Sequence, residues 1–176
     1  MIPNWIWRFH DMVHLNLSNN FLTVLENISC NMFMVDQNSN QLSGSIPLFT
    51  KGVISLDFSS NRFSIIPTDI KVYLHFTYVL SLSNDSFHGK FRKSFCNCST
   101  LRMLDISRNS FNGSIPESLT SRSNTLRELD LVGNWLIGSI SNTVSSSCNL
   151  RFLNLNGNLL EGTISKSLVN CQNLNF

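Results

Sequence analysis

The side chains that could perform chemistry in this 176-residue chain are few and scattered. The histidines are His10, His14, His75 and His88, and the chain contains no GxSxG, P-loop or HExxH motif. Catalysis needs a nucleophile with a base, or two carboxylates in one cleft, and the sequence shows neither pattern. We therefore predict that the chain is not an enzyme and that it uses no metal and no cofactor.

The cysteines also lack a metal-binding spacing. Cys30, Cys96, Cys98, Cys148 and Cys171 include no CxxC pair and no histidine partner of the kind that binds zinc. We interpret them mainly as small buried hydrophobic residues that return at a repeated position. A disulfide between Cys148 and Cys171 stays open as an alternative, because the repeat described below places them on adjoining units.

A regular row of charged residues is the third chemical feature. Three arginines recur at one position, and each stands three residues before an Asp or an Asn. The pairs are Arg102 with Asp105, Arg127 with Asp130, and Arg151 with Asn154. Such a row either binds a ligand with acidic groups or forms weak ion pairs within itself.

The row recurs because the chain is built from a repeat of about 24 residues. The stretch LRMLDISRNSFNGSIP, residues 101–116, shares its layout with LRELDLVGNWLIGSIS from Leu126 and LRFLNLNGNLLEGTIS from Leu150. A period in this range indicates one supersecondary unit used repeatedly, with each copy burying its apolar side against its neighbours. Apolar and polar residues alternate over residues 104–106, so one face of a short strand points inward.

The predicted fold is an α/β solenoid, the leucine-rich repeat, with a parallel β-sheet on its concave face and short helical or looped outer arcs. One block covers residues 1–176, with about seven repeats and a partial coil at each end. An Asn in each unit is expected to bond backbone groups of its own coil and of the next one. These ladder positions are Asn20, Asn40, Asn61, Asn109, Asn134 and Asn158, and Asp85 occupies one more.

Several positions depart from the repeat. Gln37 stands where an inward Leu is expected, Val24 replaces a Gly, and Arg92 replaces a Pro. A Gly is missing before Ile66. An ionised Asp85 can only accept hydrogen bonds, so the carbonyls that an Asn would serve lose a donor. Because neither end carries a cap, apolar surface is expected at both ends.

The stretches IPNWIW, LDFSSNRFS-IIPTDI, LSLSNDSFHG and LNLNGNLLEGTISKSLVNC together resemble plant receptor-like proteins, most closely the wilt-resistance type. The resemblance implies an internal part of the extracellular repeats, which would recognise a protein or peptide ligand in plant defence. It also implies a co-receptor kinase as partner and the extracellular side of the plasma membrane as location. The chain itself shows no signal peptide, no apolar span and no charge excess that favours nucleic acid.

Two alternatives to the receptor-like interpretation stay open. A secreted leucine-rich-repeat inhibitor of a cell-wall-degrading enzyme would use the same concave sheet. An ectodomain piece of a receptor kinase would share the repeat as well.

The outward positions of the strands form the predicted ligand-binding surface. Stacked guanidinium groups beside Met103 and Phe152 would suit a ligand with acidic and apolar groups. The other interpretation is a solvated row in which Arg and Asp neutralise each other weakly. The candidate residues are Asp36, Asp57, Arg102, Met103, Asp105, Arg127, Asp130, Arg151, Phe152 and Asn154.

Sequons for N-glycosylation are compatible with secretion, although their number is what the Asn and Ser content gives by chance. The candidate positions are Asn16, Asn27, Asn84, Asn97 and Asn112. Asn16 lies on the predicted concave strand, where a glycan would obstruct a ligand.

Overall fold

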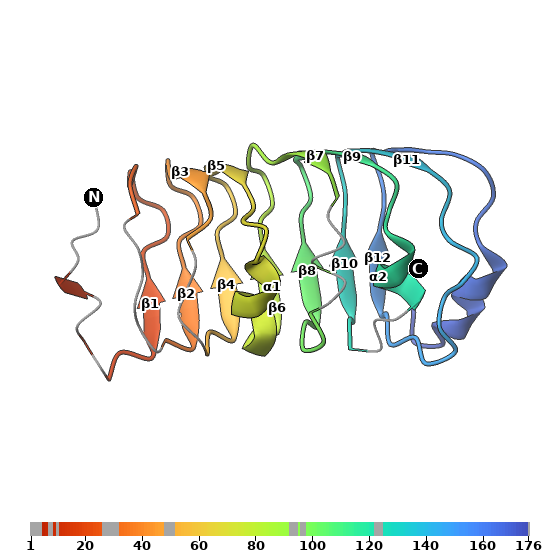
Figure 1. Cartoon of the computed structure of the whole chain (residues 1–176), viewed down its shortest axis with the longest axis horizontal. Helices are drawn as coiled ribbons and strands as arrows, with labels where there is room; N and C mark the ends of the chain where they lie inside the picture. The colour runs from red at the N-terminus through yellow and green to blue at the C-terminus, as the bar shows by residue number, and fades with distance from the viewer. Residues whose placement is uncertain are drawn as a thin grey trace.

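The computed structural model describes residues 5–6, 9, 11–25, 32–47, 52–91, 95, 98–121 and 125–175. Short strands follow one another along the long axis of an open solenoid (Figure 1), and they pair in parallel as one seven-stranded sheet. In spatial order they are β1 (His14–Asn16), β2 (Met34–Asp36), β4 (Ser55–Asp57), β6 (Val79–Ser81), β8 (Met103–Asp105), β10 (Glu128–Asp130) and β12 (Phe152–Asn154). The predicted leucine-rich-repeat solenoid with a parallel sheet is confirmed.

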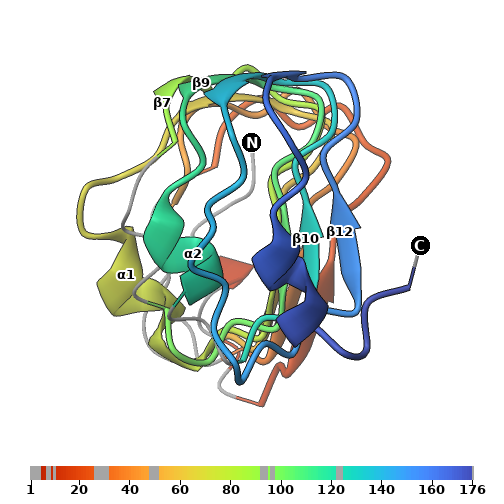
Figure 2. The same ribbon diagram turned by 90° about the vertical axis from the view of Figure 1, so that its right-hand side faces the viewer.

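The return path of each coil carries smaller elements. β3 (Ser43–Ser45) pairs with β5 (Arg62–Ile65), and a four-stranded sheet joins β13 (Leu159–Leu160), β11 (Trp135–Gly138), β9 (Ser110–Gly113) and β7 (His88–Lys90). The helices are short: α1 (Ile70–Tyr73), η2 (Leu74–Phe76), α2 (Glu117–Ser121) and η4 (Lys166–Asn170). Viewed down the solenoid, α1 and α2 lie across the interior from β10 and β12 (Figure 2). In the described ranges, no helix has the length and apolar character that crossing a bilayer requires.

The core lies between the large sheet and the outer arcs. In the large sheet the central residue of each strand points inward, and these residues stand in register, as Leu104 does with Leu80 and Leu129. Aromatic side chains fill the interior of the middle coils, where Phe87 and Phe111 stack with ring centroids 6.0 Å apart. Each coil is therefore buried mainly by the coils beside it, as expected for a solenoid.

Asparagine side chains tie each coil to the one before it. The amide nitrogen of Asn109 donates to the carbonyl of Leu82 in the preceding coil at 2.8 Å, and to those of Ile106 and Ser107 in its own coil. Its side-chain oxygen accepts the N–H of Phe87 at 3.1 Å. The same set of bonds recurs at Asn40, Asn61, Asn134 and Asn158.

The residue before each ladder position adopts a left-handed backbone, which turns the chain toward the outer arc. Gly133 and Gly157 hold this place in the last two complete coils, with φ of 63° and 66°. Non-glycine residues occupy this left-handed position in the earlier coils, with φ between 52° and 58°. The left-handed backbone costs about 1 kcal/mol for each of them. They are Asn19, Ser39, Ser60, Asn84 and Arg108.

Two expectations about single residues need correction. The structure contains a disulfide between Cys148 and Cys171, so the preferred interpretation as buried hydrophobes is wrong for this pair. Cys98 is buried, in agreement with it. At the ends, Phe9, Ile164 and Val169 are exposed and Leu153 is half-buried, so apolar surface is open there. Cys30, Cys96, Arg92, Asn27 and Asn97 lie outside the described residues.

Asp85 occupies its ladder position as a neutral acid. Its Oδ1 accepts the N–H of Phe63 at 2.9 Å, whereas its Oδ2 is buried without a hydrogen-bond partner in the described part of the chain. Burial is the largest effect and raises the pKa of Asp85 to about 8, despite the backbone N–H groups of Phe63 and Asn61. The expected ionised carboxylate is therefore wrong at neutral pH.

Asp85→Asn should stabilise the chain by an amount that depends on pH. The unfolded carboxyl ionises above its ordinary pKa of 3.8, whereas the folded one holds its proton up to about pH 8. Wild-type stability should therefore fall relative to the variant as the pH rises from 4 to 8. In urea denaturation at pH 4, we expect the free energy of unfolding of Asp85→Asn to exceed that of wild type by about 1 kcal/mol. This difference should grow by up to ~1.4 kcal/mol for each pH unit toward pH 8. A gap that is constant with pH would contradict the raised pKa.

Gln37→Leu should also stabilise the chain. Gln37 is fully buried, and neither its side-chain oxygen nor its nitrogen has a hydrogen-bond partner among the described residues. The four coils that follow bury Phe58, Leu82, Ile106 and Leu131 at this place. Because an unmade hydrogen bond inside a core costs about 1–3 kcal/mol, we expect a gain of about 2–4 kcal/mol in the free energy of unfolding. Gln41→Leu, at a half-exposed position, is the matched control, and equal effects of the two would contradict the argument.

Candidate functional site

Seven of the ten candidate ligand-binding residues lie in strands of the large sheet, and Arg102, Arg127 and Arg151 stand directly before β8, β10 and β12. The strands of this sheet present the outward positions in rows, because neighbouring strands pair without a shift in register. Met103 stands opposite Val79 and Glu128, and Asp105 stands opposite Ser81 and Asp130. Within the described residues no group of three His, Cys, Asp or Glu side chains is placed to hold a metal ion.

The row of Asp and Asn residues has a structural role that the sequence analysis missed. Oδ1 of Asp105 accepts the N–H of Ser107 at 2.9 Å, which closes the turn after the strand. The same bond recurs at Asn16, Asp36, Asp57, Asp130 and Asn154. One oxygen of each carboxylate is thus committed to the fold, and the second is left for a ligand or a neighbour, as when Asn16 donates to Oδ2 of Asp36 at 3.1 Å.

The three arginines lie at the start of the strands, away from those carboxylates. Arg102, Arg127 and Arg151 are exposed, and the backbone N–H of each later one donates to the carbonyl of the one before. The Arg102 guanidinium carbon lies 4.4 Å from the ring centroid of Tyr78, a cation–π contact. In the described part of the chain none of the three forms an ion pair. The arrangement therefore does not support mutual neutralisation of Arg and Asp.

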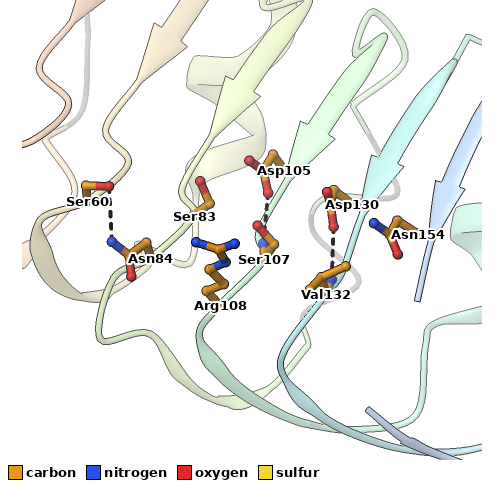
Figure 3. A pocket seen from close by; sticks show the side chains of 9 residues that line it. All are labelled: Ser60, Ser83, Asn84, Asp105, Ser107, Arg108, Asp130, Val132 and Asn154. Atoms are coloured by element: carbon orange, nitrogen blue, oxygen red, sulfur yellow. Dashed lines mark hydrogen bonds between the residues drawn. The ribbon is translucent and has the colours of Figure 1, made fainter. Parts of the chain in front are cut away.

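A polar hollow of about 340 Å³ opens where the strands from β4 to β12 end (Figure 3). Arg108 reaches into it, between Ser83 and Ser107 in this view, and Asp105 and Asp130 lie on its far side. Burial raises the pKa of Asp130; the Val132 N–H lowers it, Asp105 raises it and Arg108 lowers it. The lining residues are Ser60, Ser83, Asn84, Asp105, Ser107, Arg108, Asp130, Val132 and Asn154.

Arg108 and Tyr78 are site residues that the sequence analysis did not single out. Both had a signal in the repeat itself. Tyr78 stands at the same place as Arg102, two residues before the inward Leu. Arg108 holds the left-handed position that Gly133 and Gly157 hold in the next two coils. Because glycine has no side chain, the next two coils place nothing over Arg108 at this position.

Comparison with known proteins identifies the relationship. The leucine-rich-repeat family model matches residues 100–121 and 149–171. Receptor-like protein 54 of Arabidopsis thaliana is 30% identical over 144 residues, which make up 79% of this chain and 15% of that protein. Receptor-like protein 53 of the same plant is 34% identical over 149 residues, or 82% of this chain and 13% of that protein. This chain is a leucine-rich-repeat solenoid related to plant receptor-like proteins.

The solenoid spans less than a sixth of the length of either receptor-like protein. Because the relatives are receptor-like proteins and the repeat is the leucine-rich one, the solenoid is non-catalytic, as predicted. The ectodomain of the Arabidopsis receptor kinase HAESA, in complex with the peptide hormone IDA and the co-receptor SERK1, superposes with a TM-score of 0.79 at 26% identity. That superposition covers 99% of this chain and 30% of HAESA. A plant ice-binding protein, with a TM-score of 0.62 and 20% identity, shares the fold alone.

The turn role of the Asp row can be tested at Asp105. Asp105→Ala removes the acceptor for the Ser107 N–H and should cost about 1 kcal/mol of stability. Asp105→Asn keeps an acceptor oxygen and should stay within about 0.5 kcal/mol of wild type, which urea denaturation can resolve. Equal losses in both variants would show that the charge, and not the turn, determines the residue.

Proposed function

We propose that this solenoid is part of the ligand-recognition surface of a plant cell-surface immune receptor-like protein of the wilt-resistance type. It binds a protein or a peptide through its concave face and performs no chemistry on it. The observation that carries the proposal is the exposed arginine row, which has no ion-pair partner in the described ranges and stands directly before the strands that end at the polar hollow. Interfaces favour arginine and aromatic anchors, and Tyr78 and Phe152 supply the aromatic part.

The partner class follows from the related receptors. HAESA is in complex with the peptide hormone IDA in two solved structures, one of which also contains the co-receptor SERK1. The structure without the co-receptor is 29% identical to this chain and covers 99% of it. By analogy, a co-receptor kinase is the second partner of the full-length protein, and the extracellular side of the plasma membrane is its location. The likeness to HAESA also favours a second candidate, an ectodomain piece of a receptor kinase.

The candidate glycosylation sites differ in what they would do to this surface. Asn112 is exposed on β9, outside the large sheet, so a glycan there leaves the concave face open. Asn16 ends the concave strand β1, and Asn84 lines the hollow with its amide bonded to Ser60. Glycosylation at Asn112, and none at Asn16 or Asn84, is the pattern compatible with the proposed function.

The test is a pair of substitutions on the concave face. A ligand is first selected from secreted proteins of plant pathogens or from extracellular plant peptides. The double variant Arg127→Ala with Phe152→Ala should bind this ligand at least tenfold more weakly than wild type, as measured by biolayer interferometry. Both side chains are exposed, so the circular dichroism spectrum and the melting curve should stay unchanged.

The matched control lies on the outer arc. Lys71→Ala with Val72→Ala removes two exposed side chains of α1. Binding that survives the concave pair but is lost in the α1 pair would move the site off the concave face and overturn the proposal.

A further inference from the structure

One row of residues, directly before the strands of the large sheet, changes character along the solenoid. We call it the edge row: the residue two places before the inward residue of each strand in the large sheet. Its members are Val13, Phe33, Ile54, Tyr78, Arg102, Arg127 and Arg151. The first four are apolar or aromatic, and the last three are cationic.

The edge row is continuous in space. The backbone N–H of Phe33 donates to the carbonyl of Val13, and that of Tyr78 to Ile54, each at 2.8 Å. Arg102 donates to Tyr78 and Arg127 to Arg102 in the same way, at 2.8 and 2.7 Å. Successive members therefore lie one coil apart, about 4.8 Å, and the contact of Arg102 with the Tyr78 ring joins the two halves.

The apolar half is open to solvent. Val13 is 45% exposed, Phe33 48% and Tyr78 37%. Met34, next to Phe33 and on the outward face of β2, is 46% exposed and widens this half. Three such side chains in one row, with Met34 beside them, form an exposed apolar cluster, which is typical of a contact surface.

The cationic half is not neutralised at the edge. Among the described residues, Glu128 is the one carboxylate beside the three arginines of the edge row. It is the first residue of β10 and follows Arg127 directly. Asp105 and Asp130 lie three residues further along their strands, about 10 Å away, which is about one Debye length in physiological salt. One oxygen of each is also held by its own turn. The edge therefore carries a local excess of positive charge over its last three coils.

We infer that the edge row binds one extended peptide segment that is apolar at one end and acidic at the other. Its apolar side chains lie over Phe33 and Tyr78, and its carboxylates bind Arg127 and Arg151. The five steps from Phe33 to Arg151 span about 24 Å, which about seven extended residues cover. This inference rests on the proposed concave-face function and adds the class and the polarity of the ligand.

Neither half alone would suit a uniform ligand. A wholly apolar segment would take the guanidinium groups of Arg127 and Arg151 out of water without an acceptor. A wholly acidic segment would leave Phe33 and Met34 in water. Only a segregated ligand satisfies both halves, and this separates the edge row from a general acidic-protein surface.

Two synthetic peptides of nine residues test the inference on the full chain. In the segregated peptide, Leu and Phe alternate with Ser in one half and Glu alternates with Ser in the other. The interleaved peptide has the same composition with the apolar and acidic residues mixed. Fluorescence anisotropy should show the segregated peptide binding at least tenfold more tightly than the interleaved one.

Substitutions then assign the two ends. Arg127→Gln with Arg151→Gln, and separately Phe33→Ser, should each weaken the segregated peptide at least tenfold, whereas Glu128→Gln should strengthen it two- to fivefold. Arg62→Gln on β5 and Phe21→Ser, both exposed outside the concave sheet, are the matched controls and should change nothing.

Equal binding of the two peptides, or no binding of either, would overturn the inference. So would losses in the controls as large as those in the edge row. If the peptides fail while Arg127→Ala with Phe152→Ala still abolishes capture of a secreted ligand, the polarity is wrong and the concave-face function stands. If that pair also has no effect, the concave-face function is wrong as well.

Discussion

The interaction on which the rest of this solenoid depends is the hydrogen bonding of the ladder asparagines. A side-chain amide offers both donors and an acceptor, so one residue can bond the carbonyl and the N–H of the preceding coil together with carbonyls of its own. Asn109 does all of this from a buried position. A slip of one residue between coils would break these bonds and turn the strand side chains to the opposite face. The ladder therefore fixes the register that stacks the concave rows.

The concave face follows from this register. Its Asp and Asn residues close the turns after the strands, while the edge row before the strands is largely exposed, with Arg102 over the Tyr78 ring. The polar hollow lies between these turns and the left-handed residues that precede the ladder, which is how Arg108 comes to reach into it. Two neighbouring regions, one polar and one mixed apolar and cationic, thus share a rigid support.

The repeat in the sequence was sufficient to predict the sheet, because inward apolar residues at a fixed period leave one way to bury them. It also placed Arg102, Arg127 and Arg151 in one row. It could not predict that Asp85 is protonated, since that depends on how deeply Oδ2 is buried. The positions of Arg108 and Tyr78 can be aligned in the repeat, but the left-handed turn at Arg108 and the contact of Tyr78 with Arg102 depend on spatial neighbours. For Cys148 and Cys171 the sequence left two alternatives open, buried hydrophobic residues or a disulfide. The spacing of the two cysteines alone does not distinguish them.

The most direct test of the ladder as the organising constraint is amide hydrogen exchange of Phe87, whose N–H donates to the side chain of Asn109. In an Asn109→Ala variant, exchange at Phe87 should become at least tenfold faster relative to exchange at Leu136, which is bonded to Asn158 two coils further on. The exposed Asn112→Ala variant is the control and should leave the ratio unchanged. An unchanged ratio in Asn109→Ala would show that apolar packing alone holds the coils in register, and would contradict this account.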